Sequence, residues 1–150
     1  MIWKKLLEDG SLQKKKISFR EVELVLDKSH ESLRAADFLL KKNIIEPAFK
    51  EAYDAMLLAG RSIIFSLGLK SKTTGSHTIV INFCELYFGS EFKVLIEKFK
   101  RMKTKRNYLI YGSGLAISST EAENSIQNAK KFLKVVEEEI NKIKRQSKLI

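Results

Sequence analysis

The chain has 150 residues, 44% of them hydrophobic, a size that excludes two large domains and allows one continuous core. Lysine and arginine number 28 against 18 aspartates and glutamates, so the formal net charge of +10 favours anionic partners such as nucleic acid, nucleotides or an acidic protein. The single cysteine, Cys84, excludes a scaffold of intrachain disulfides. The longest apolar stretches are too short to span a membrane, and residues 1–5 do not open a signal peptide, so we expect a cytoplasmic protein with no membrane association.

Breakers of secondary structure are rare, because the chain has one proline and only seven glycines, and this composition predicts an all-α fold. Residues 1–19 are expected to hold a short helix near residues 2–7 and a basic linker, Lys14 to Lys16. A first long helix is predicted over residues 20–42, because apolar residues recur there at steps of three and four. These residues are Val22, Val25, Leu26, Leu33, Ala36 and Leu40.

A second long helix is predicted from about residue 48 to residue 69, opened by Pro47 at a first-turn position where its missing N–H costs little. This helix is the most apolar, and its small residues Ala59 and Gly60 would let a neighbouring helix approach closely. Residues 70–75 have no periodicity and are interpreted as a loop, after which Ser76 could cap the next element.

Residues 77–88 allow two interpretations, because a β-branched run suits a strand whereas Ile79, Phe83 and Leu86 keep helical spacing. No partner strand is expected elsewhere, so we predict a helix. Ser90 is then expected to cap a further helix, whose inward face is formed by Phe92, Leu95, Ile96, Phe99 and Met102.

Residues 112–118 are expected to break that helix, and the last and longest helix should start at Ser119 or Thr120. Its apolar residues form a seam of the coiled-coil type. They are Ala122, Ile126, Ala129, Leu133, Val136, Ile140 and Ile143. The pattern predicts a single helical domain over residues 1–150, with an up-and-down antiparallel bundle of four main helices and short accessory helices in residues 20–150.

Positive charge is concentrated in one short run of the fourth main helix. The cations are Lys98, Lys100, Arg101, Lys103, Lys105 and Arg106. The run is either a solvated helix face or a phosphate-binding surface. Arg106 stands apart, because seven residues bring it back to within roughly 20° of Phe99 on the apolar stripe. An inward arginine needs anionic or carbonyl partners, and an ion pair with Glu51 or Asp54 is one alternative.

Two polar side chains follow Arg106 closely. Asn107 comes directly after it, and Tyr111 lies four residues beyond Asn107, on the same face of a continuing helix. A cation, an amide and a phenol at one helix end could grip a phosphate and stack on a base or sugar. Lys103, Lys105 and Arg101 are expected to assist in binding RNA or a nucleotide.

The segment from Phe99 to Tyr111 resembles the signature of HEPN domains, in which an arginine, usually followed by a polar residue, precedes a histidine by four to six residues. The segment from Ala52 to Arg61 resembles the second helix of the prokaryotic branch of that family. Residues 119–132 resemble its last helix, and residues 3–7 resemble its opening, so the resemblance covers nearly the whole chain.

The resemblance implies a homodimer formed through the motif helix. It also implies either a metal-independent endoribonuclease toxin or a module that only binds RNA or nucleotides, often encoded with a nucleotidyltransferase of the MNT type that serves as antitoxin. By position, Arg106, Asn107 and Tyr111 correspond to the catalytic arginine, the polar residue and the histidine of the family. An ordinary tyrosine with a pKa near 10 is a poor base at neutral pH, which leaves enzymatic activity open, although Arg106 could still stabilise a phosphorane.

No other cofactor or catalytic group is expected. His30, His77 and Cys84 do not form a metal set, and no glycine-rich phosphate loop is present. His77 resembles a histidine that follows a lysine-rich loop in relatives, without an assigned role. Two functions therefore remain: a toxin-like RNA- or nucleotide-binding protein, and a non-catalytic helical scaffold for a nucleotidyltransferase or another partner.

Overall fold

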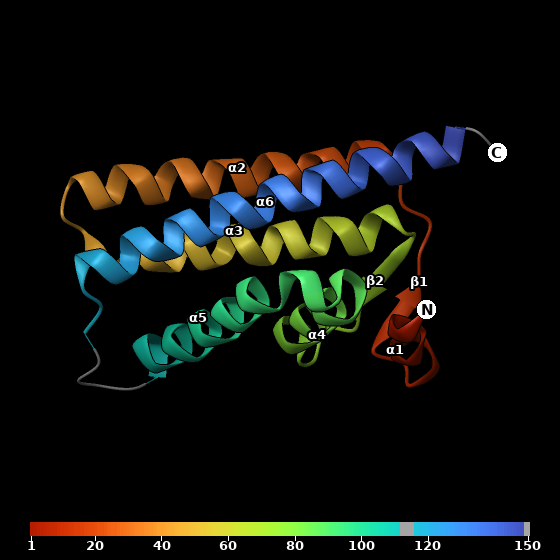
Figure 1. Ribbon diagram of the computed structural model, residues 1–150, viewed down its shortest axis with the longest axis horizontal. Coiled ribbons are helices and arrows are strands. Elements are labelled where there is room, and N and C mark those ends of the chain that lie inside the picture. Colours follow the sequence, from red (N-terminus) through yellow and green to blue (C-terminus); the bar gives the residue numbers. More distant parts are fainter. Residues whose placement is uncertain (112–115, 149–150) are drawn as a thin grey trace.

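The computed structural model describes residues 1–111 and 116–148, and it confirms the predicted all-α bundle (Figure 1). Long helices that follow one another in the chain run in opposite directions, whereas α3 and α6 lie side by side and run the same way (Figure 1). In chain order the elements are η1 (Ile2–Lys4), α1 (Lys5–Glu8), β1 (Leu12–Lys14), α2 (Phe19–Lys41), α3 (Ile45–Ser66), β2 (Leu69–Ser71), α4 (Ser76–Phe88), η2 (Ser90–Phe92), α5 (Lys93–Tyr111) and α6 (Ser119–Lys148).

Helix α2 begins and ends within one residue of the predicted bounds, and local hydrogen bonds explain both ends. Ser18 and Glu21 form a capping box, in which the Glu21 amide donates to Ser18 Oγ and the Ser18 amide donates to Glu21 Oε2. At the other end Asn43 takes a positive φ of 61°, and the Ile44 amide donates to the Leu39 carbonyl at 2.9 Å. This Schellman ending turns the chain directly into α3.

Helix α3 ends at Ser66, three residues before the predicted end, because Gly68 takes a φ of 72° and leads the chain into β2. β2 pairs with β1 in antiparallel register, with Lys14 opposite Leu69. This small sheet corrects the prediction of a basic linker and an unstructured loop without strands. Strands of three residues are too short to show an alternating pattern, and the sheet is anchored instead by the buried side chains of Leu12 and Leu69.

The ambiguous segment after β2 is a helix, α4, as predicted. Its N-cap is Gly75 with a φ of 70°, and Ser76 is the first helical residue, so the expected cap at Ser76 is wrong. The predicted close approach at Gly60 is confirmed, because a Cβ atom there would lie 2.5 Å from Val80 Cγ1 of α4.

Helix α5 begins at Lys93 after the short η2, so Ser90 does not cap it as predicted. Helix α6 starts at Ser119, and Ser118 caps it by accepting a hydrogen bond from the Glu121 amide at 3.1 Å. All seven predicted seam residues of α6 are buried.

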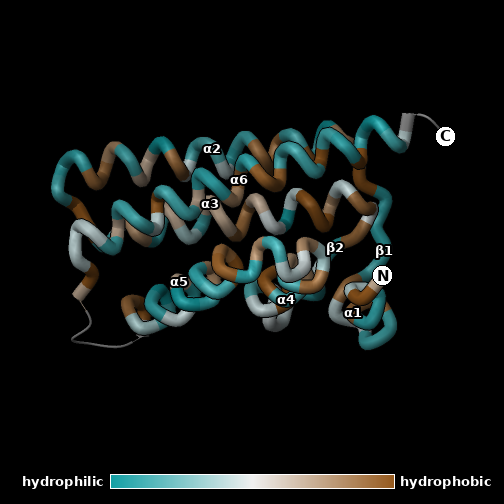
Figure 2. Tube along the Cα trace, in the orientation of Figure 1, coloured by the Kyte–Doolittle hydropathy of each residue, from teal (hydrophilic) through white to brown (hydrophobic). Residues whose placement is uncertain are grey.

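The core lies around α3, whose hydropathy is apolar along most of its length, whereas α2 and α6 alternate between apolar and polar residues (Figure 2). Buried aromatic rings connect α3, α4, α5 and α6, and Cys84 is buried among them as a small core residue. Within the described ranges, no helix has the length and apolar character needed to cross a membrane.

Candidate functional site

The cations of α5 lie on different sides of the helix and have different surroundings. Lys103 and Arg106 are three residues apart on the side toward α3 and α4, where the charges of both act on His77. Arg101 and Lys105 are four residues apart and line a hollow of about 400 Å³ between α5 and α6. The predicted group of binding cations is therefore divided between two surfaces.

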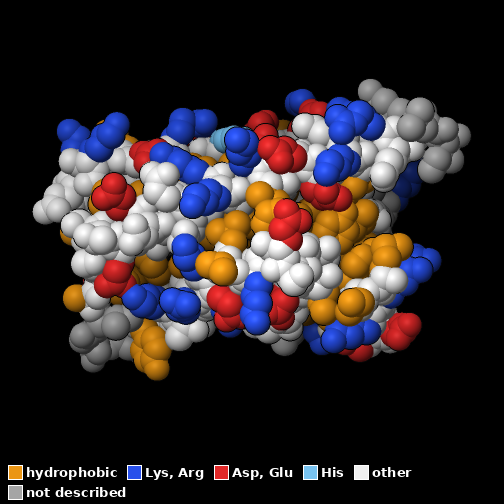
Figure 3. Space-filling model, in the orientation of Figure 1, with side chains coloured by type: hydrophobic (Ala, Val, Ile, Leu, Met, Phe, Trp, Pro, Cys, Tyr) orange, Lys and Arg blue, Asp and Glu red, His pale blue; other side chains and the backbone are white. Residues whose placement is uncertain are grey.

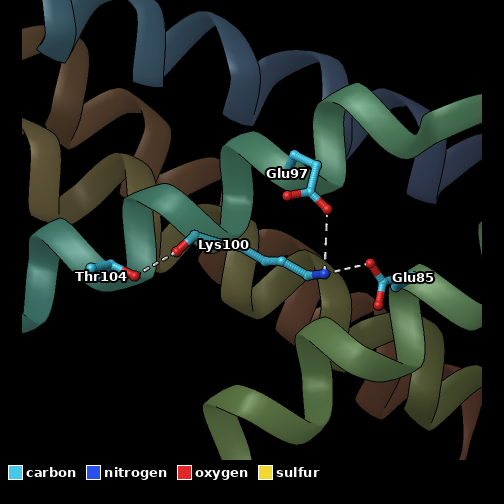
Figure 4. Close-up of polar contacts among 4 residues, drawn as sticks. All are labelled: Glu85, Glu97, Lys100 and Thr104. Carbon is cyan, nitrogen blue, oxygen red and sulfur yellow. Dashed lines mark hydrogen bonds and ion pairs between the residues drawn. The ribbon is translucent and has the colours of Figure 1, made fainter.

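On the side of α5 toward α6, one cation has a carboxylate partner. Lys105 forms an ion pair with Glu121 near the start of α6, and this contact lowers the pKa of the Glu121 carboxyl. Lys100, three residues before Lys103, pairs with Glu85 of α4 and with Glu97 at 3.4 Å (Figure 4). Lys100 and Lys105 therefore fit the interpretation of the basic run as a solvated helix face stabilised by ion pairs better than that of a phosphate-binding surface.

Arg106 points inward, as its spacing from Phe99 predicts. The carbon at the centre of its guanidinium lies 5.8 Å from the centroid of the Tyr53 ring, and Tyr53 is fully buried on α3. The alternative ion pair with Glu51 or Asp54 is wrong, because no carboxylate oxygen of the described residues lies within 4 Å of Arg106. A cation above an aromatic ring gains about 0.5 to 2 kcal/mol and keeps its hydrogen-bond donors available.

His77 completes the surroundings of the Tyr53 ring. The hydroxyl of Tyr53 and Nδ1 of His77 share a hydrogen bond of 3.0 Å. Burial raises the pKa of Tyr53, so its hydroxyl remains protonated. The pKa of His77 is lowered, first by burial and then by the charges of Arg106, Arg61 and Lys103. The imidazole is therefore neutral at neutral pH.

Arg61, in the second half of α3, is the third cation of this group. Its charge acts on Tyr53 and on His77, and it opposes the rise that burial and Glu51 cause in the pKa of Asp54. Among the described residues, neither Arg61 nor Lys103 has a carboxylate oxygen within 4 Å. We refer to Tyr53, Arg61, His77, Lys103 and Arg106 as the Arg106 site.

The Arg106 site contains residues that the sequence analysis did not select. Tyr53, Arg61 and His77 come from α3 and α4; the first two lie in the segment from Ala52 to Arg61 that carried the resemblance, and His77 resembles a histidine of relatives, but none was predicted as a site residue. Asn107 follows Arg106 and is half-buried. Helix α5 extends to Tyr111, but the side chain of Tyr111 lies outside the described part of the chain, as do residues 112–115.

The remaining candidates have structural surroundings. His30 is exposed on α2, and its Nε2 lies 2.9 Å from Oε1 of Glu137. Within residues 1–111 and 116–148, no three side chains of His, Cys, Asp or Glu gather as metal ligands would. The Arg106 site combines three cations that lack carboxylate partners with a neutral imidazole, an arrangement suited to contacting a phosphate group.

This bundle, with an inward arginine near the end of a long helix, is the architecture that the sequence resemblance implies. Comparison with models of protein families matches residues 22–140 to the HEPN domain, from α2 through most of α6. The chain therefore belongs to the HEPN domain family, as predicted. Comparison with curated proteins found no match. Membership of this family supports a function related to nucleotides or RNA.

Proposed function

We propose that the protein binds RNA or a nucleotide by holding a phosphate group in the Arg106 site. The observation that carries this proposal is the position of Arg106 over the Tyr53 ring with no carboxylate oxygen of the described residues within 4 Å. A guanidinium in that position is pre-oriented, and its donors match two phosphate oxygens. On the face shown in Figure 3, lysine and arginine side chains are interspersed with acidic ones.

The test compares two variants that each remove one positive charge from α5. Arg106→Ala should weaken the binding of a fluorescently labelled single-stranded oligoribonucleotide by about 10- to 100-fold, the loss of one charged hydrogen-bond partner worth about 1.5 to 3 kcal/mol. Lys105→Ala serves as the matched control, because this lysine already has Glu121 as its partner. Fluorescence anisotropy measures both. Equal affinities for the two variants would contradict the proposal.

A weak, metal-independent endoribonuclease activity is the second function that we propose, and the neutral imidazole of His77 favours it. In this reaction the 2′-hydroxyl attacks the adjacent phosphorus while the bond to the 5′-oxygen breaks. The products are a 2′,3′-cyclic phosphate and a 5′-hydroxyl. The base takes the proton of the 2′-hydroxyl, the leaving oxygen receives a proton, and Arg106 stabilises the charge on the phosphorane. Asn107 and Tyr111 remain the predicted assisting residues of the motif.

Incubation of the purified protein with labelled total RNA in EDTA tests this activity. We expect products that end in cyclic phosphate, their loss in Arg106→Ala, and a strong reduction in His77→Gln. Cleavage that persists in His77→Gln would assign the base to another residue such as Tyr111. RNA that stays intact with the wild-type protein would contradict the nuclease and leave the binding function.

We also propose that the protein forms a homodimer through α5. Its last turns carry two exposed apolar residues, Tyr108 and Ile110, whose exposed fractions are 59% and 42%. Ile110→Glu should convert a dimer to a monomer, as measured by light scattering after size exclusion. Val94→Glu, at the opposite end of α5 with 70% of Val94 exposed, is the control. A monomeric wild-type protein would exclude the dimer.

We also propose a toxin-like role in the cytoplasm, in which the protein is paired with an MNT-type nucleotidyltransferase as antitoxin. Expression alone should slow bacterial growth, Arg106→Ala should restore it, and co-expression of an MNT-type nucleotidyltransferase should do the same. Binding of that enzyme without any effect of Arg106→Ala on growth or RNA binding would favour the non-catalytic scaffold instead.

A further inference from the structure

A second basic surface lies outside the predicted site, where β1, β2, α3 and the start of α4 meet. It is a pocket of about 320 Å³. Four of its lining residues are cations, three carry hydroxyl groups, and no acidic residue lines it. The cations are Lys15, Arg61, Lys70 and Lys72.

The small sheet explains why these cations converge. The Lys15 amide donates to the Gly68 carbonyl at 2.9 Å, and the Lys72 amide donates to the Ser11 carbonyl at 2.9 Å. The antiparallel ladder therefore brings two basic segments, more than fifty residues apart in the chain, to the same end of the bundle (Figure 1). Arg61 reaches the pocket from α3.

Within the part of the chain that the structure describes, the cations of this pocket form no ion pair, because none of the four has a carboxylate oxygen within 4 Å. The charge of Lys72 acts on Asp9, but Asp9 does not line the pocket. Four like charges around one concave surface repel one another, and an anion in the pocket would relieve that repulsion.

The hydroxyl groups and the backbone add donors to the same surface. Thr73 and Ser76 line the pocket, and Ser76 is the first residue of the 13-residue helix α4. In the described part of the chain, the amides of His77 and Thr78 in that first turn donate to no acceptor. Cations, hydroxyls and free amides together form the set of donors that recognises phosphate oxygens.

We propose that this pocket is a second phosphate-binding site, which extends the Arg106 site through the shared residue Arg61. The inference rests on the proposed function in one respect: the two sites would hold different phosphates of one ligand. That ligand is either a single RNA strand, with one backbone phosphate in each site, or a nucleotide whose phosphate chain occupies the pocket.

The first experiment tests the pocket without RNA. Inorganic phosphate is titrated into the ¹⁵N-labelled protein at constant ionic strength, and the amide resonances of residues 70–77 are followed by NMR. We expect saturable shifts in the wild-type protein and their loss in the double variant Lys70→Gln/Lys72→Gln. The control Lys28→Gln/Lys134→Gln removes the same charge from exposed lysines of α2 and α6 and should keep the shifts. An absence of shifts in the wild type, or their persistence in the pocket variant, would overturn the inference.

The second experiment identifies the source of the phosphate. For a single RNA strand, each lost phosphate contact lowers the slope of log K against log salt by about 0.7, so the pocket variant, which loses one phosphate, should lose about 0.7 while the control keeps the wild-type slope. If the wild type binds a nucleoside triphosphate through Lys70 and Lys72 but not RNA, the source is a nucleotide.

If RNA is bound and the slopes of the pocket variant and the control agree, the pocket has no role and the inference fails, although the Arg106 site stands. If Arg106→Ala binds normally while the pocket variant does not, the proposed function of the Arg106 site fails and the pocket remains.

Discussion

The two sides of helix α5 carry similar numbers of cations but differ in what surrounds them. Toward α6, Lys105 has a carboxylate partner in Glu121. Toward α3 and α4, Arg106 lies on an aromatic ring and shares its surroundings with Arg61, Lys103 and a neutral His77. A cation that already has a partner stabilises the bundle slightly, whereas a cation without one remains available for an external anion. What separates individual cations is therefore their nearest partner, because among the described residues Arg101 toward α6 has no carboxylate oxygen within 4 Å, whereas Lys100 pairs with Glu85 of α4.

The largest effect is expected from removing the ring beneath Arg106. Tyr53→Ala should lower the free energy of unfolding by about 3 to 5 kcal/mol, because a fully buried aromatic side chain is lost and a cavity remains. Urea denaturation measures this loss. A loss below about 1 kcal/mol would mean that the Tyr53 ring contributes little to the packing of α3 against α5.

Removing only the hydroxyl group should have a smaller effect. Tyr53→Phe keeps the ring under Arg106 but ends the hydrogen bond to His77, and should lower the free energy of unfolding by about 0.5 to 1.5 kcal/mol. A double-mutant cycle with His77→Gln isolates the contact. Additive effects of the two substitutions would show that the hydrogen bond contributes nothing to stability.

The pH dependence of stability should differ between the two sides of α5, and we expect this effect to be smaller than that of Tyr53→Phe. The folded-state pKa of His77 lies below its ordinary value of 6.5, so the unfolded chain binds this proton more readily. Stability from His77 is therefore complete above pH 6.5 and is lost as the pH falls toward the folded-state pKa. The pKa of Glu121 is also lowered, from an ordinary 4.5, so its contribution is lost only below pH 4.5.

Denaturation measured between pH 8 and pH 5 tests this assignment, with His77→Gln as the comparison. The variant should show a flatter profile than the wild type in that range. Identical profiles would mean that another group titrates there.

The smallest effect is expected on the side toward α6. Lys105→Ala should change the free energy of unfolding by less than about 1 kcal/mol, because both partners of the ion pair are largely exposed. The difference from the wild type should vanish in about 1 M salt, where charges are screened. Thermal unfolding at low and high salt measures this difference in stability. A larger difference that persists at high salt would show that the Lys105–Glu121 ion pair stabilises the protein more than an exposed ion pair does.

Helices were the predictable part of this molecule. The seam of α6 repeats at helical spacing, and all of its members are buried. Helix α4 was predicted from the helical spacing of Ile79, Phe83 and Leu86, despite its β-branched run, and this prediction is confirmed. The inward position of Arg106 also followed from its spacing to Phe99. These features depend on the period of one helix, which the sequence displays directly.

The contacts between elements were not predictable in the same way. Tyr53 and His77 are 24 residues apart, and nothing local to either residue indicates that they share a hydrogen bond. The partners of Lys100 and Lys105 lie on other helices, so the basic run could not be divided into paired and unpaired cations from the sequence. The three-residue strands lack any periodic signal and depend on burial of Leu12 and Leu69.

The pairing of β1 with β2 has a consequence for where the functional unit begins. The family match starts at residue 22, so Lys15, the whole of β1 and Trp3, which packs against Phe83, lie before it. A fragment cut to the matched residues would keep Tyr53, His77 and Arg106 but would lose one wall of the basic pocket and the strand that supports Lys70. The N-terminal segment is thus part of the folded unit, because Trp3, Leu6 and Leu12 are buried in the same hydrophobic core as α3 and α4.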